Sequence, residues 1–268
     1  MIHVAVTGAA GRMGKAIICA VHENPLTELA GALEREGCPF IGKDAGETAG
    51  TVKAGVKIIA DIGKAFKKAD VIIDFTLPEA TVKHLEYAVA EKKALVIGTT
   101  GFSHHQRDAI KEDGAKARVV MAPNMSVGVN LLLKLVQDAA AVIGNDYDIE
   151  IIEAHHRHKK DAPSGTAVRL AEVLASTVGR DLEKVAVYER KGIVGERRPE
   201  EIGIQSIRAG DIVGDHTVIF AGPGERIELT HKASSRDTFA MGAVKAAIWL
   251  SGKPNGIYDM QDVLGFNG

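Results

Sequence analysis

The first half of the chain alternates short apolar runs with stretches of helical period. The runs in "IHVAVT", "ADVIIDF", "KALVIG" and "ARVVM" are rich in β-branched residues, and a helix pattern carrying Ile17, Ile18 and Val21 follows the first run. Strands that alternate with helical stretches are typical of βαβ units and a parallel sheet. We therefore expect residues 1–126 to form an α/β domain on a doubly wound parallel sheet.

The pattern changes after Ser126. Amphipathic helices are predicted over "VGVNLLLKLVQDAAAVIG" and "GTAVRLAEVLASTVG", with the strand "YDIEIIEAHH" between them. Strand-like segments then follow in succession: "KVAVYER", "IGIQSIRAG", "GDHTVIFAG" and "ERIELTHKAS". They predict an α+β domain over 127–236 on an open mixed or antiparallel sheet, whose free face suits association. A closing helix is expected at Asp237–Leu250, and we assign 237–268 to the first domain.

A glycine-rich turn joins the first strand to the first helix. Gly8, Gly11 and Gly14 follow the strand with the spacing G-x-x-G-x-x-G. Residues without a Cβ let backbone amides approach a pyrophosphate, and the helix N-terminus offers unpaired N–H groups and partial positive charge. The same spacing also fits an ordinary strand-to-helix turn, so the turn indicates a dinucleotide only together with its neighbours.

The end of the second expected strand carries an acid and a base side by side. Glu34 lies about 20 residues beyond the last glycine, where an acid typically holds the adenosine ribose. Arg35 is suited to face a 2′-phosphate. The pair predicts use of both NADH and NADPH, the alternative being two solvated turn charges.

Polar and glycine-bearing segments also end the later strands of this half. They are Asp74–Thr76, Gly98–Gly101 and Ala122–Met125. Ligands of doubly wound sheets bind beyond the carboxyl ends of the strands. These ends are therefore expected to line a nicotinamide site in a Rossmann-like domain.

Composition excludes several classes of function. Lys and Arg number 33 against 35 Asp and Glu, a formal charge of −2 that argues against a nucleic-acid-binding protein. No apolar stretch approaches the roughly 20 residues of a membrane span, and the N-terminus lacks the pattern of a signal peptide. Cys19 and Cys38 have no metal or redox spacing and are expected to be free thiols. We expect a cytoplasmic protein.

The segment 153–167, "EAHHRHKKDAPSGTA", is unusually dense in cationic side chains. A metal site is disfavoured because His155, His156 and His158 lack a fourth ligand at a familiar spacing, and no metal is expected. A nucleic-acid patch lacks interleaved aromatic residues, whereas a solvated loop stays open as an alternative. The remaining interpretation is an active site that binds an anion and donates a proton.

That interpretation has a physical basis in a predicted helix start. Ser164 is suited to cap the helix, and the amides of Gly165 and Thr166 would then point outward to hold a carboxylate. Neighbouring histidine and lysine would neutralise a small dianion, and His155 or Lys159 would deliver a proton to the atom that becomes electron-rich after hydride arrives. A dinucleotide domain joined to such a site makes a reductase.

At these residues the sequence resembles the bacterial 4-hydroxy-tetrahydrodipicolinate reductase (dihydrodipicolinate reductase) family of lysine and diaminopimelate biosynthesis. The resemblance covers the whole chain through "VAVTGAAGRMG", "LERE", "DFT", "GTTGF", "APNMSVGVN", the 153–167 segment and "HKASSRDTFAMGA". It implies NADH- or NADPH-dependent reduction of a small dicarboxylate, the dehydrated form of (2S,4S)-4-hydroxy-2,3,4,5-tetrahydrodipicolinate, by a homotetramer.

The resemblance also assigns roles to individual residues. The implied dinucleotide contacts are Gly8, Ala9, Ala10, Gly11, Arg12, Met13, Glu34, Arg35, Gly98, Thr99, Thr100, Ala122, Pro123, Asn124 and Met125. The implied proton donors are His155 and Lys159, and the implied substrate-binding residues are His156, Gly165 and Thr166. The alternatives are an aspartate dehydrogenase or a similar amino-acid dehydrogenase, which has no need for the 153–167 segment, and an NAD(P)-sensing regulator without turnover.

Overall fold

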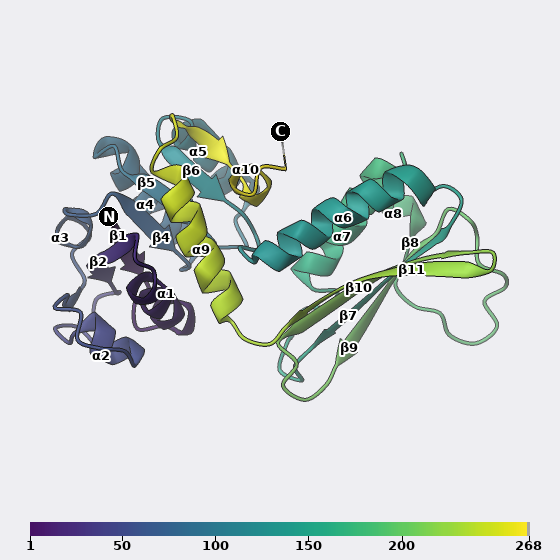
Figure 1. The fold of residues 1–268 in the computed structure, drawn as a ribbon, viewed down its shortest axis with the longest axis horizontal. Helices are drawn as coiled ribbons and strands as arrows, with labels where there is room; N and C mark the ends of the chain where they lie inside the picture. Colours follow the sequence, from purple (N-terminus) through teal and green to yellow (C-terminus); the bar gives the residue numbers. More distant parts are fainter. Residues whose placement is uncertain (267–268) are drawn as a thin grey trace. The chain divides into compact units, whose positions relative to one another are not determined.

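Two units make up the chain, whose computed structural model describes residues 1–266 (Figure 1). Unit 1 comprises Met1–Val127 and the segment that begins at Arg236, and unit 2 comprises Gly128–Ser235. The boundaries expected from the sequence lie within one residue of these, and the roles given to the two units stay predictions.

Unit 1 is built on a seven-stranded sheet with the order β12-β6-β5-β4-β1-β2-β3, in which every pair of neighbouring strands is parallel. Its strands are β1 Ile2–Thr7, β2 Thr27–Leu33, β3 Ile58–Ile59, β4 Val71–Asp74, β5 Ala94–Ile97, β6 Arg118–Met121 and β12 Gly256–Tyr258. Its helices are α1 Arg12–Glu23, α2 Ala45–Ala49, α3 Ile62–Phe66, α4 Pro78–Ala90, α5 His104–Gly114, α9 Asp237–Leu250 and α10 Met260–Val263.

Helices cover both faces of this sheet. Along β1, Val4 and Val6 belong to a buried cluster with residues of α1 and α9, whereas Ala5 belongs to a second cluster with residues of α3, α4 and α5. A strand buried on both faces reads as a continuous apolar run, as "VAV" does here. The doubly wound parallel sheet expected from the sequence is confirmed.

Unit 2 contains a five-stranded sheet with the order β11-β10-β7-β9-β8. Strands β7, β9 and β8 run parallel, and β10 and β11 pair antiparallel, so the expected mixed sheet is confirmed. Its elements are α6 Val127–Ile143, β7 Asp148–His155, α7 Gly165–Thr177, α8 Leu182–Val185, β8 Ala186–Val187, β9 Ile202–Arg208, β10 Gly214–Gly222 and β11 Glu225–Ala233.

One face of the unit 2 sheet carries the core. Ile149 and Ile151 of β7 are fully buried in a cluster with residues of α6 and α7, while the alternate residues Glu150 and Ile152 on the other face are half-buried. Because side chains of a strand point to opposite faces in turn, odd-numbered residues of β7 share the core side. His155 therefore lies on the same face as Glu153.

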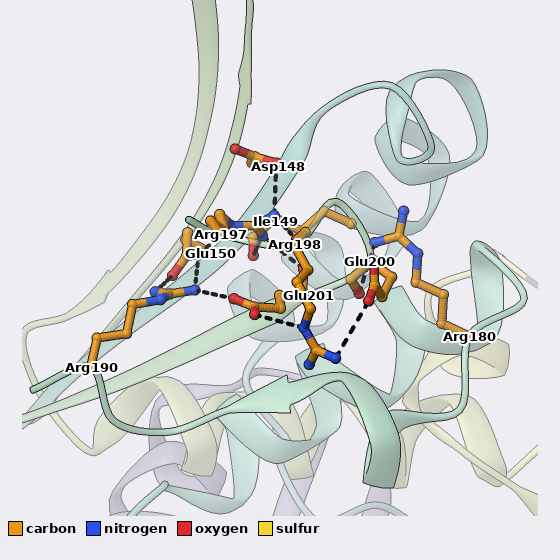
Figure 2. A network of polar contacts seen from close by, with 9 residues as sticks. All are labelled: Asp148, Ile149, Glu150, Arg180, Arg190, Arg197, Arg198, Glu200 and Glu201. Atoms are coloured by element: carbon orange, nitrogen blue, oxygen red, sulfur yellow. Dashed lines mark hydrogen bonds and ion pairs between the residues drawn. The ribbon is translucent and has the colours of Figure 1, made fainter. Parts of the chain in front are cut away.

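The strand expected over "KVAVYER" is wrong for most of its length. Only Ala186–Val187 pair with β9, and residues 188–201 form a loop instead. Figure 2 shows that arginines of this loop bind acids of β7: Arg190 contacts both carboxylate oxygens of Glu150 at 3.0 and 2.9 Å, and Arg197 lies 2.7 Å from Asp148. These ion pairs hold the loop against the face of the sheet that α6 and α7 leave uncovered.

Among residues 1–266, none of the helices is both long and apolar enough to cross a membrane.

Candidate active site

The glycine turn of unit 1 requires its glycines. Gly8 has φ +59°, a backbone conformation that favours glycine, and a Cβ at Gly14 would lie 2.1 Å from the carbonyl oxygen of Gly8. Helix α1 thus approaches the turn too closely for any side chain at Gly14. Its N-cap is Gly11, and no described side chain caps the helix, which leaves the first-turn N–H groups to water or a ligand.

Glu34 connects the end of β2 to this turn. Its Oε1 accepts the N–H of Ala10 at 3.0 Å, and its Oε2 accepts the N–H of Arg35 at 3.1 Å. A cavity of about 450 Å³ is lined by Gly8, Glu34 and Arg35 together with residues of α4, among them Lys83. The turn, the acid and the arginine expected to hold the adenosine end therefore lie at one cavity.

Two residues of α4 at this cavity were not predicted from the sequence. Lys83 and His84 line it together with Ala80. The signal was available, because positions 80, 83 and 84 are spaced i, i+3 and i+4 and so share one face of a helix. Pro78 begins that helix.

A buried carboxylate fixes the ends of β1 and β4. Asp74 is fully buried and accepts hydrogen bonds from the hydroxyls of Thr7 at 2.9 Å and Thr76 at 2.6 Å. His84 Nδ1 lies 2.6 Å from its other oxygen. Thr99, just after β5, accepts the N–H of Thr76 at 2.9 Å, so adjacent strand ends are held in one network.

The remaining expected cofactor residues follow β5 and β6. Thr99 is buried and Thr100 is exposed, while Ala122 and Met125 are buried. Met125 lies in the core beside α9, where a Cβ at Gly242 would lie 1.8 Å from the Met125 carbonyl oxygen. Its side chain is therefore part of the packing of unit 1.

In unit 2, the proton donor expected at the end of β7 is held by a buried acid. His155 is 9% exposed, and its Nδ1 lies 2.6 Å from Oε2 of the fully buried Glu153. Arg208 donates to both oxygens of Glu153, at 2.8 and 2.7 Å. An ionised carboxylate accepts hydrogen bonds and donates none, so Glu153 is matched to donors on every side.

The charges of this cluster follow from its surroundings. Burial acts to raise the pKa of Glu153, but hydrogen bonds from Arg208, Ser206 and His155 outweigh it and lower the pKa to about 2. Burial lowers the pKa of His155, against the opposing effect of Glu153. His216 is buried against His155, and burial followed by the charge of His155 lowers its pKa to about 4.

The start of α7 joins the same cluster. Ser164 caps the helix as expected, with its hydroxyl accepting the N–H of Ala167 at 3.2 Å. The Ser164 N–H donates to Glu153 Oε1 at 3.1 Å, and its hydroxyl lies 3.1 Å from His216 Nε2. The carboxylate that holds His155 therefore also holds the helix start where Gly165 lies.

The other residues expected in this site lie in the segment between β7 and α7 or at the start of α7. Lys159 Nζ is 2.8 Å from a carboxylate oxygen of Asp161. His156 follows His155 directly, and its buried Nδ1 has no hydrogen-bond partner among the described residues. A Cβ at Gly165 would meet no heavy atom of the described chain within 4 Å beyond its chain neighbours, so the helix start is open on that side. Thr166 comes next in the first turn of α7.

Sequence reasoning missed Glu153, Arg208 and His216. The signal for Glu153 was its position two residues before His155 on a predicted strand, which puts both on one face. The other two come from the strand register, since His155 pairs with Arg208 of β9 and Glu153 pairs with His216 of β10. Among residues 1–266, no group of three or more His, Cys, Asp or Glu side chains is arranged to hold a metal ion.

Comparison with known proteins gives matches over both units. The family description "Dihydrodipicolinate reductase, N-terminus" matches residues 2–125, and "Dihydrodipicolinate reductase, C-terminus" matches residues 128–264. The 4-hydroxy-tetrahydrodipicolinate reductases of Syntrophotalea carbinolica and Hahella chejuensis are 55% and 57% identical to the chain over 265 residues, which is 99% of this chain and of each relative.

Solved structures agree with these matches. A dipicolinate-bound dihydrodipicolinate reductase from Paenisporosarcina sp. TG-14 has a TM-score of 0.76 and 26% identity, covering 98% of both chains. An amine dehydrogenase from Mycobacterium smegmatis, at TM-score 0.58 and 12% identity over 96% of this chain and 94% of that chain, shares the fold alone.

These matches set aside the amino-acid dehydrogenase and the NAD(P)-sensing regulator considered from the sequence. The relatives that cover the whole chain at more than half identity are reductases, and the 153–167 segment lies within the matched C-terminal half. The chain belongs to the dihydrodipicolinate reductase family and is an oxidoreductase of lysine biosynthesis, a 4-hydroxy-tetrahydrodipicolinate reductase.

Proposed function

We propose that unit 1 holds NADH or NADPH, and that unit 2 holds the dehydrated form of 4-hydroxy-tetrahydrodipicolinate and supplies the proton for its reduction. The observation that carries the proposal is the buried carboxylate of Glu153, which holds both His155 and the open start of α7. A proton donor and an anion-binding helix end are thereby kept in one cluster.

Family membership implies a nucleotide cofactor, and the residues of unit 1 fit one. The Gly14 position has no room for a Cβ, so α1 begins directly at the turn, and Glu34 and Arg35 line the adjoining cavity with Gly8. We assign the cofactor to the turn Gly8–Met13, to Glu34 and Arg35, and to the strand ends Gly98–Thr100 and Ala122–Met125. Bound there, a reduced nicotinamide supplies the hydride.

The substrate carries two carboxylates, and unit 2 offers groups of the matching charge. The first-turn amides of α7, at Gly165 and Thr166, are suited to one carboxylate, with His156 beside the same segment. His155 and Lys159 hold the proton that the reduced substrate accepts, and Asp161 orients the Lys159 ammonium. The Paenisporosarcina relative, named as dipicolinate-bound, supports a planar dicarboxylate as a ligand.

The exposed face of the unit 2 sheet supports a homotetramer. Ile207 is 47% exposed on this face, the half-buried Ile152 lies on the same face, and the 188–201 loop exposes Ile193 and Val194. Apolar side chains gathered on one sheet and its loop mark an association surface. The cytoplasmic location expected from the sequence stays a prediction.

Replacement of Ile207 by Glu tests the tetramer. Four chains of 28.4 kDa give a particle of about 114 kDa, and a charge on the sheet face is expected to convert it to smaller species in light scattering. Val142→Glu is the matched control, because Val142 is 80% exposed on α6. A wild-type mass of one chain, or equal effects of the two variants, would contradict the assignment.

Arg35→Ala is expected to separate the two cofactors. Loss of a charge-assisted hydrogen bond to a 2′-phosphate removes about 1.5–3 kcal/mol, so the KM for NADPH should rise about tenfold or more. The KM for NADH should change little, because that cofactor lacks the phosphate. Lys53→Ala, at an exposed cation outside the residues that line the cavity, is the control. Equal changes for both cofactors would remove Arg35 from this role.

Gly165→Val is expected to weaken dicarboxylate binding in a protein that still folds. The new side chain meets open space in the protein itself but occupies the approach to the α7 amides. The Kd for pyridine-2,6-dicarboxylate, titrated by calorimetry, should rise at least about tenfold, the equivalent of 1.4 kcal/mol. Gly252→Val, also in open space but at the end of α9, should leave the Kd unchanged. Unaltered binding in Gly165→Val argues against an anion site there.

Alanine variants of the 153–167 segment are expected to divide by role. General acid catalysis contributes about 10²–10⁴-fold, so His155→Ala and Lys159→Ala should lower kcat on that scale. His156→Ala should chiefly raise KM, because binding lost equally from ground and transition states spares turnover. Steady-state kinetics with the product of dihydrodipicolinate synthase measures both, with the exposed His158→Ala as control. Near-normal kcat in both His155→Ala and Lys159→Ala would favour the alternative interpretation of the segment as a solvated loop.

A further inference from the structure

Glu153 forms hydrogen bonds with both parts of the proposed site, the proton donor and the start of α7. It lies on β7 two residues before His155, on the same face, and is fully buried. One oxygen faces His155 Nδ1 at 2.6 Å and Arg208 Nη1 at 2.8 Å. The other accepts from Arg208 Nη2 at 2.7 Å and from the Ser164 N–H at 3.1 Å.

This arrangement defines which nitrogen of His155 faces Glu153. A carboxylate without a proton can only accept, and Glu153 carries none at neutral pH because its pKa is about 2. The hydrogen on neutral His155 therefore lies on Nδ1. Nε2 is left on the side of Gly214, where a Cβ would lie 3.0 Å from it. Because Gly214 has no side chain, no Cβ covers His155 Nε2 at this position.

We propose that Glu153 is a positioning residue of the reaction: it holds His155 with Nδ1–H inward and Nε2 as the proton-donating nitrogen, and it fixes the start of α7 through Ser164. The proposal rests on the role of His155 stated above. Arg208 completes the unit by neutralising the buried carboxylate, since an unpaired buried charge is strongly destabilising.

The charge of Glu153 also acts on the protonated form of His155. Burial disfavours the imidazolium, and Lys159 and Arg208 act in the same direction. The hydrogen bond and negative charge of Glu153 oppose them. His216, whose ring centroid lies 5.2 Å from that of His155, is the facing group from β10. Without the carboxylate, the pKa of His155 should fall further.

Glu153→Gln tests the proposal, because it keeps the shape and removes the charge. A protonated donor is lost as pH rises through its pKa, so the high-pH fall of kcat should move to lower pH in this variant. The kcat at pH 7 should drop at least about tenfold, and at most by the ~10²–10⁴-fold expected for loss of the acid itself. Glu150→Gln is the matched control on the same strand: Arg190 binds Glu150 through both oxygens (Figure 2), but Glu150 lies on the opposite face from His155.

A double variant separates positioning from a general structural role. If Glu153 acts through His155, then Glu153→Gln should cost little further kcat in the His155→Ala background. Nitrogen-15 NMR of histidine-labelled wild-type protein gives a second readout, independent of turnover. Assigned through His155→Ala, the neutral His155 ring should be protonated on Nδ1.

Several results would overturn the proposal. If the neutral ring of wild-type His155 is protonated on Nε2, the proposal is overturned by that result alone, even if Glu153→Gln fails to fold. An equal loss of kcat from Glu153→Gln with and without His155 assigns Glu153 to the fold alone, as does an unmoved pH profile. If His155→Ala has normal turnover while wild-type His155 is protonated on Nδ1, then His155 is not the proton donor, and the positioning role of Glu153 fails with it. This outcome differs from the others, in which only the positioning role fails.

Discussion

A carboxylate removed from water must be surrounded by donors, and this requirement organises unit 2. Glu153 obtains its donors from β7, from β9 and from the residue that caps α7. Leaving a buried carboxylate unpaired costs several kcal/mol, so these three segments have a strong reason to keep their mutual positions. The geometry of the site therefore follows from the need to pair the buried Glu153 carboxylate in the folded protein.

Unit 1 uses the same physical device at another sheet. Asp74 is fully buried and is bound by the hydroxyl of Thr7 at the end of β1, by the hydroxyl of Thr76 just after β4, and by a histidine of α4. The strand ends that it connects carry the glycine turn and the Thr99 segment proposed to hold the cofactor. In both units, a buried acid thus forms hydrogen bonds with residues at or next to a proposed ligand site. These bonds hold the residues expected to contact the ligands in position.

Local features of this site could be predicted from the sequence, because their causes are local. The first strand, the glycine turn and the Ser164 cap depend on neighbours within a few residues, and each is found where expected. Arg208 and His216 could not be placed, because they reach Glu153 only through the register of strands more than 50 residues away along the chain. The strand expected over 184–190 fails for a related reason, since Arg190 binds Glu150 of a distant strand and the backbone leaves the sheet.

The Glu153 cluster is proposed to present a proton donor and an anion site to the same substrate. A crystal structure with pyridine-2,6-dicarboxylate tests this proposal most directly. We expect one carboxylate on the amides of Gly165 and Thr166, the ring within hydrogen-bond reach of His155 Nε2, and Glu153 still bound to Arg208. A ligand seated away from α7, or one that faces His155 through Nδ1, would contradict it.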